Sequence, residues 1–395
     1  MKNKFLLLGL LLLTFGCRNN EKERLTVRIE GLQEDSLICA YMTPATIRDR
    51  QPMVQRMIGG QKSADGKSVE FRVTTPDDEQ LYRMILAPRG YRGDGPRQTI
   101  QLFLLPGEND LRVEGKYEGE HQTIDYTLTG SPVQEEWLER QKVIEPLEMQ
   151  LGMLGMTASF VQPGSGVADS LQMQMQVLAD SISSLKTDYI AENPSAQLSA
   201  YYLTTIGDPY LVDSLYRGLD DSVKNGPFKA WLDLQNEEIA KVFAAEEART
   251  AMAGGGVAPD FTLPGLDGKD FTLSSLFNKE GRYIVLDFWG TWCSWCIKGM
   301  PEMKKAYAEL GNGRQVEFVG IDCGDTEEAW KKGVEKHGLP WIHVRAEGDD
   351  IPVRYGIEAF PTKIILAPDG STVRRFTGED PAFYTCLDSL VRAAR

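Results

Sequence analysis

Two of the six cysteines, Cys293 and Cys296, stand three residues apart and carry the clearest chemical signal in the sequence. The apolar run 283–289 precedes them and predicts a strand buried on both faces. Apolar residues spaced four and three apart follow and predict a helix over about 296–310. Cys293 would then lie at or just before the helix N-terminus, where free backbone N–H groups and the helix dipole stabilise an anion. We therefore expect the pKa of the Cys293 thiol to fall from about 8.5 to about 7 or below.

Cys296 lies nearly one helical turn further on, which permits a small disulfide ring with Cys293. We expect Cys296 to be the more buried of the two and to resolve a mixed disulfide formed by Cys293. A zinc site is the first alternative, but it normally needs two further Cys or His ligands at short spacing. The remaining candidates are isolated in the sequence: Cys323, Cys386, His121, His337 and His343. The spacing favours a redox pair over a metal site, and a purely structural disulfide remains the third alternative.

The elements around this pair resemble a thioredoxin-fold domain of the ResA/TlpA class of envelope thiol–disulfide oxidoreductases. The matching segments are the hairpin residues 258–263 and 266–269, the core motif 287–293 with Cys296, the helix proline Pro301, and the loop 360–362. Residues 326–344 look like the additional helix and strand that this class inserts. The resemblance spans 257–395, about a third of the chain.

The resemblance implies where a substrate would bind. In the thioredoxin fold the loop that contains Pro361 has a cis X-Pro bond and faces the two cysteines. The residue before this proline, here Phe360, offers backbone hydrogen bonds to an extended peptide. Trp292, Phe360 and Pro361 are therefore expected to contact the substrate. Phe360 is bulky for this position and is expected to shape the groove, and a packing role for it is the alternative.

The acid group near the cysteines departs from the family pattern. ResA-like members commonly carry a glutamate three residues after the second cysteine, where this chain has Gly299. Thioredoxins instead carry a buried aspartate on the preceding strand, and Asp287 stands at that position. Burial would raise the pKa of Asp287, which could then accept the Cys296 proton through a water. The alternative is an aspartate at the strand end that faces solvent.

The N-terminus has the features of an export and lipidation signal. Lys2 and Lys4 precede the apolar run 5–16, which is too short to cross a bilayer as a helix. Residues 13–17 resemble the lipobox of bacterial lipoproteins. We expect a signal peptide over 1–16, lipid attachment at Cys17 and a polar tether over 17–24. The protein would then be lipid-anchored in the cell envelope and face the periplasm.

The rest of the chain divides by its pattern of residues. Alternating runs separated by turn signals predict an antiparallel β domain over 25–130, in which the lone Cys39 is a buried small side chain. Helical spacing predicts a helical region over 131–252. Ala253 and the three glycines at 254–256 predict a linker over 253–256, before the α/β thioredoxin domain 257–395. The net charge of −14, with no concentrated basic face, argues against a nucleic-acid partner.

These features predict a multidomain thiol–disulfide oxidoreductase that acts as a reductase. Its partners would be disulfide-containing envelope proteins and a membrane electron donor. It would need no cofactor or metal beyond the redox-active disulfide. One rival is a thiol peroxidase, but the peroxidase motif P-x-x-x-T-x-x-C is absent because Leu286 and Gly290 stand where it needs Pro and Thr. Another is a binding lipoprotein whose thioredoxin domain is a passive scaffold.

Overall fold

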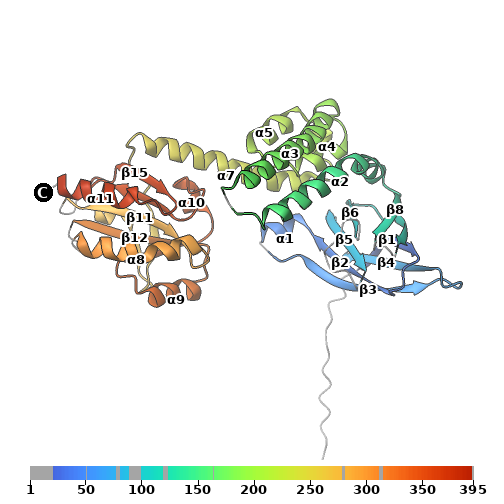
Figure 1. Cartoon of the computed structure of the whole chain (residues 1–395), viewed down its shortest axis with the longest axis horizontal. Coiled ribbons are helices and arrows are strands. Elements are labelled where there is room, and N and C mark those ends of the chain that lie inside the picture. The colour runs from blue at the N-terminus through green and yellow to red at the C-terminus, as the bar shows by residue number, and fades with distance from the viewer. Residues whose placement is uncertain are drawn as a thin grey trace, which may run out of the picture. The chain divides into compact units, whose positions relative to one another are not determined.

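The computed structural model describes residues 21–49, 51–76, 81–88, 99–118, 123–162, 164–277, 281–310 and 315–393. The expected signal peptide over 1–16 and the expected lipidation residue Cys17 lie outside these residues. The chain forms two compact units, Met1–Asn236 and Glu237–Arg395 (Figure 1). Across the described ranges, no helix combines the length and the apolar character needed to cross a membrane.

Eight strands of the first unit form one hydrogen-bonded sheet, in the spatial order β6-β5-β2-β3-β4-β1-β7-β8. Their bounds are β1 Glu21–Glu30, β2 Ser36–Met42, β3 Val54–Lys62, β4 Ser68–Pro76, β5 Tyr82–Pro88, β6 Ile100–Leu104, β7 Leu111–Glu118 and β8 Thr123–Thr129, with the short helix α1 at Pro44–Arg48. Alternate apolar residues from strands along the whole sheet, including Val27, Phe71 and Leu102, pack into one core with Cys39. The predicted antiparallel β domain is thus confirmed, although β1 and β7 pair in parallel.

The first strand begins earlier than the sequence suggests. Residues 21–24, expected in a polar tether, are the start of β1, where Glu21 pairs with Pro76. Arg24 is buried, and its guanidinium donates to the carbonyl oxygens of Leu105 and Glu108. Arg24 can be buried because these carbonyl acceptors replace the water that would otherwise bind its guanidinium. The acceptors come from distant residues, so the charged segment 21–24 does not indicate in the sequence that it belongs to a strand.

Helices follow the sheet, as the sequence predicts. They are α2 Pro132–Ala158, α3 Gly166–Glu192, α4 Gln197–Leu203, α5 Pro209–Gly218, α6 Asp221–Lys224 and α7 Lys229–Ala253. The two units divide at Asn236 inside α7, whereas the sequence places a linker directly after this helix. Met252, in the last turn of α7, is buried in a core of the second unit, which accounts for this difference.

The second unit is a five-stranded sheet in the order β13-β12-β11-β14-β15, preceded by a small hairpin. Its elements are β9 Thr262–Pro264, β10 Asp270–Thr272, the 3-10 turn η1 Leu273–Leu276, β11 Tyr283–Trp289, α8 Ser294–Glu309, β12 Val316–Cys323, α9 Glu327–His337, β13 Ile342–Ala346, α10 Asp350–Arg354, β14 Thr362–Leu366, β15 Thr372–Thr377 and α11 Ala382–Ala393. The strands β11, β12 and β13 are parallel, and β14 and β15 run antiparallel to their neighbours. The inserted helix and strand expected at 326–344 are α9 and β13.

Both faces of this sheet are covered by other elements. Side chains on both sides of β11 are therefore buried, which explains why its sequence is apolar at nearly every position. One face packs against side chains of α8, α9 and α11, including Met300, Trp330 and Phe383. The other face packs against the hairpin, η1 and α10. Side chains at alternate positions of a strand therefore face opposite sides of the sheet, so odd- and even-numbered residues of one strand pack into different cores.

Candidate active site

The parity of β11 places its one charged residue on the same face as the cysteines. Val285 and Trp289 belong to the core that contains Cys293 and Cys296, whereas Ile284 and Leu286 belong to the opposite core. Successive side chains of a strand alternate between faces, so Asp287 points to the cysteine side. The same parity applies on β14, where Ile365 is on the cysteine side and Lys363 therefore is too.

Cys293 and Cys296 form a disulfide. Cys293 is the N-cap residue of α8, and the backbone N–H of Cys296 donates to its Sγ at 3.1 Å. This is the predicted position at the helix N-terminus. The expected contrast in burial is small, because Cys293 is 6% and Cys296 4% exposed.

The loop before the pair is held by residues that sequence reasoning missed. Asp325, after β12, accepts from the backbone N–H and the hydroxyl of Thr291, both at 2.6 Å. The indole of Trp292 donates to the carbonyl oxygen of Cys323 at 3.0 Å. These bonds hold Thr291 and Trp292 in place directly before Cys293.

Trp292 and Phe360 meet beside the pair. Their rings are 5.1 Å apart in an edge-on arrangement, and Trp292 is 57% exposed. The Phe360–Pro361 peptide bond is cis. The structure thus brings the three predicted contact residues, Trp292, Phe360 and Pro361, together beside the cysteines.

Asp287 is buried, with 6% of its surface exposed, and its Oδ1 has no hydrogen-bond partner among the described residues. Burial raises the pKa of this carboxyl to about 6, since an ionised group is costly to desolvate. The positive charge of Lys363 opposes this rise, and the negative charge of Glu379 adds to it. The Asp287 carboxyl therefore titrates closer to neutral pH than an exposed aspartate does.

Lys363 and Glu379 form a buried ion pair that the sequence analysis did not identify. Lys363 is the register partner of Asp287 on β14, and only 1% of its side chain is exposed. Its ammonium group contacts the Glu379 carboxylate at 2.6 Å. A lysine within the apolar run 362–366 was the available signal, because buried lysines need a partner. Glu379 gave no comparable signal.

The Glu379 carboxylate fills the space beside Gly299. A Cβ added at Gly299 would lie 2.1 Å from the Cδ of Glu379. The position where relatives were expected to carry a glutamate is therefore occupied by a carboxylate from another part of the chain.

A second buried acid lies next to Trp289 in the sheet register, at Asp322. Burial and the neighbouring Asp325 raise the pKa of Asp322 to about 8. His343 on β13 is also buried, which lowers its pKa to about 4. Both groups are expected to be uncharged at neutral pH in this layer.

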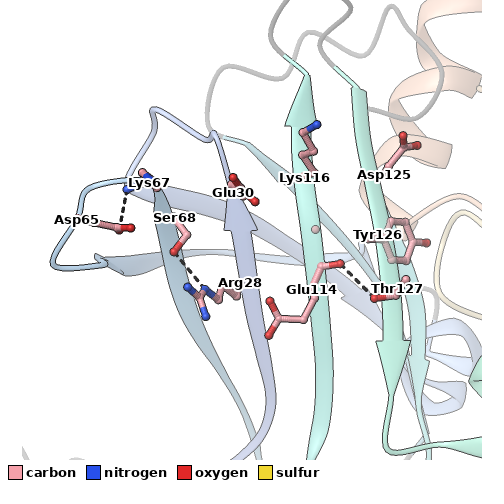
Figure 2. Close-up of a pocket in the computed structure, with 11 residues that line it drawn as sticks. Arg28, Glu30, Asp65, Lys67, Ser68, Glu114, Lys116, Asp125, Tyr126 and Thr127 are labelled. Atoms are coloured by element: carbon pink, nitrogen blue, oxygen red, sulfur yellow. Dashed lines mark hydrogen bonds between the residues drawn. The ribbon is translucent and has the colours of Figure 1, made fainter.

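The first unit offers no comparable chemistry in its hollow of about 480 Å³ (Figure 2). Its lining carries charges of both signs, including Arg28, Lys116 and Glu114, and none of the described residues that line it is a cysteine or histidine. In the part of the chain that the structure describes, no three His, Cys, Asp or Glu side chains gather as a metal site would require.

Comparison with known proteins agrees with this geometry. The AhpC/TSA family matches residues 255–375. ResA, a thiol-disulfide oxidoreductase of Bacillus thuringiensis, is 34% identical over 122 residues, which are 31% of this chain and 68% of that protein. The chain belongs to the ResA family of thiol–disulfide oxidoreductases. The ResA of Bacillus cereus is 32% identical over 137 residues, covering 35% of this chain and 75% of that protein.

Solved structures are similar over about a third of the chain. The thioredoxin domain of a thiol-disulfide oxidoreductase from Bacteroides vulgatus is 30% identical, covers 35% of this chain and 96% of its own, and has a TM-score of 0.32. A thiol-disulfide oxidoreductase from Bacteroides fragilis is 28% identical, covers 34% and 98%, and has a TM-score of 0.31.

Proposed function

We propose that this ResA-family protein reduces disulfides of proteins in the cell envelope. The Cys293 thiolate attacks one sulfur of a substrate disulfide, and the other substrate sulfur leaves as a thiolate. Cys296 then attacks the Sγ of Cys293, the bond to the substrate breaks, and the substrate leaves with two thiols. Two electrons pass to the substrate, and the enzyme retains a Cys293–Cys296 disulfide.

The observation that carries this proposal is the position of Cys293. Its Sγ accepts the Cys296 N–H at the first turn of α8, where the helix dipole also favours negative charge. This setting lowers the free energy of a thiolate, which is the attacking species. Cys296 is a position inside the helix rather than its N-cap, so its thiol needs a separate base.

Asp287 is proposed as that base. Its side chain lies on the face of the sheet that packs against the cysteines. With a pKa of about 6, its carboxyl group is mostly ionised at neutral pH and can accept a proton. When Cys296 attacks, its proton would pass to the Asp287 carboxylate through a water and later return to solvent.

The exposed aromatic residues beside the pair are proposed to receive the substrate. Trp292 and Trp295 are 57% and 60% exposed, and Phe360 precedes the cis-proline. An extended peptide can hydrogen-bond to the backbone of Phe360 while its apolar side chains cover these rings. The substrate class is thus an unfolded or extended protein segment that contains a disulfide.

The cellular setting follows from the sequence and belongs to the same proposal. The chain would be anchored by lipid at Cys17 and face the periplasm, and a membrane electron donor would reduce its disulfide again. No further cofactor is required for this cycle, because the cysteine pair carries both electrons.

Thiol peroxidase is the second candidate, since the matching family is named AhpC/TSA. Leu286 is fully buried and Gly290 has no side chain, so neither offers the groups of the peroxidase motif. Parallel assays of insulin reduction and peroxide consumption, with dithiothreitol as the donor, separate the candidates. We expect insulin reduction that is lost in Cys293→Ser, with little peroxide consumption. Peroxide consumption alone would indicate a peroxidase, and neither activity would favour a passive scaffold.

A further inference from the structure

Gly299 faces a carboxylate that comes from elsewhere in the chain. Glu379 lies in the loop between β15 and α11, 80 positions after Gly299, yet its carboxyl group fills the volume of a Gly299 side chain. With 18% of its side chain exposed, Glu379 is largely removed from water. Any side chain at position 299 would displace it, so the glycine and the glutamate fit each other.

The same carboxylate is linked to Asp287 through one lysine. Lys363 stands opposite Asp287 on the neighbouring antiparallel strand, where Cβ atoms are about 4.5–5.5 Å apart. Its ammonium group lies 2.6 Å from Glu379. A lysine this deeply buried needs a counter-charge. Without Glu379, Asp287 could supply it, because Asp287 stands opposite Lys363 in the register and senses its charge.

We propose that Glu379 is a positioning residue for the resolving step: it holds the Lys363 ammonium away from a direct ion pair with Asp287 and so keeps Asp287 available as a base. This inference rests on the proposed function and deepens it. In the step itself the S–H bond of Cys296 breaks, and its proton passes to Asp287. A bond forms between the two cysteine sulfurs, and the substrate sulfur leaves with the electron pair. Glu379 exchanges no atom or electron.

The charges around Asp287 make this role measurable. Titratable groups that face it from the packed elements, or that sense its charge, are Cys293 and Cys296 of α8, Lys363 of β14, Glu379 of the following loop, Tyr384 of α11 and Cys323 of β12. Removal of the Lys363 charge should raise the pKa of Asp287, whereas removal of the Glu379 charge should lower it. An ion pair that does not influence Asp287 would leave the pKa of this carboxyl unchanged in both variants.

The test follows both exchange steps with the aromatic disulfide dithiobis(nitrobenzoate) as the probe. The reduced full chain, carrying Cys17→Ser and Cys386→Ser, should release thionitrobenzoate in two stopped-flow phases. The first phase reports attack by Cys293, and the second reports resolution by Cys296. In the parent protein we expect the second rate to rise with pH through a midpoint near 6.

We expect Lys363→Met to move this midpoint upward by about 1 unit and Glu379→Gln to move it downward by a smaller amount. The first phase should not change. Glu309→Gln, on the exposed surface of α8, is the matched control. The double variant Gly299→Glu with Glu379→Gly supplies the carboxylate from α8 instead and should restore the parent midpoint, even if a single variant folds poorly.

Midpoints that do not move, or that move in the same direction in Lys363→Met and Glu379→Gln, overturn the inference. The double variant gives a further check. If Gly299→Glu with Glu379→Gly has the same midpoint as Glu379→Gly alone, the inference is also overturned. Loss of the first phase in the parent protein would instead contradict the proposed function, so the two failures are distinguishable.

Discussion

Replacement of Asp287 by asparagine should stabilise the oxidised protein in a pH-dependent way. Burial raises the pKa of this carboxyl from 3.8 to about 6. The folded state therefore holds a proton between these two values that the unfolded chain has lost. The free energy of unfolding falls as the pH rises through this window, and it stays lower above it.

The size of the effect follows from the two pKa values. One pKa unit corresponds to about 1.4 kcal/mol, so the ionised carboxyl costs the fold about 3 kcal/mol at pH 7 and less than 1 kcal/mol at pH 4. Asp287→Asn removes this cost and adds a term for the buried amide that does not depend on pH. The stability gained should therefore be about 2 kcal/mol larger at pH 7 than at pH 4.

Urea denaturation of the oxidised protein at the two pH values measures this difference. Asp270→Asn, at an exposed strand position in the same unit, is the control and should change stability little at either pH. An equal effect of Asp287→Asn at pH 4 and pH 7 would refute the reasoning, because it would mean that Asp287 does not titrate between them.

The remaining predictions concern exchange, substrate binding and anchoring. Cys296→Ser should accumulate mixed disulfides on non-reducing gels and Cys293→Ser should not; the reverse pattern would exchange the two roles. Asp287→Asn should slow resolution about 10²–10⁴-fold and leave the first attack unchanged, as stopped-flow kinetics would show. Phe360→Ala should raise KM for a disulfide peptide while the rate with a small aromatic disulfide stays constant, whereas an equal loss with both would indicate a packing role. Cys17→Ala should abolish fatty-acid labelling and release the protein from membranes, and an unlabelled parent protein would contradict the anchor.

The sequence was informative where local order decides the structure. Cys293 follows a buried strand and opens a helix, so its N-cap position could be derived from spacing alone. Asp287 sits in an apolar strand, and the parity of that strand brings it to the cysteine side. The antiparallel β domain and the helical region were likewise predictable, because turn residues and periodicity mark their elements.

The sequence was uninformative where distant segments meet. Lys363 and Glu379 approach Asp287 only after β14 and β15 have paired, and nothing near Gly299 indicates that a glutamate fills its space. The parallel contact of β1 with β7 joins strands far apart in the chain. The start of β1 was missed for a different reason, since Arg24 is buried by carbonyl acceptors that its neighbours in sequence do not reveal.

The reduction potential of the Cys293–Cys296 pair tests the central claim most directly. The full chain would be equilibrated with defined ratios of reduced and oxidised dithiothreitol and glutathione, and its free thiols would then be trapped and counted. A reductase should lie near thioredoxin, at about −270 mV, and well below about −200 mV. A value near −120 mV, typical of a strong oxidant, would contradict the proposed direction, and a pair that never exchanges would contradict the redox role itself.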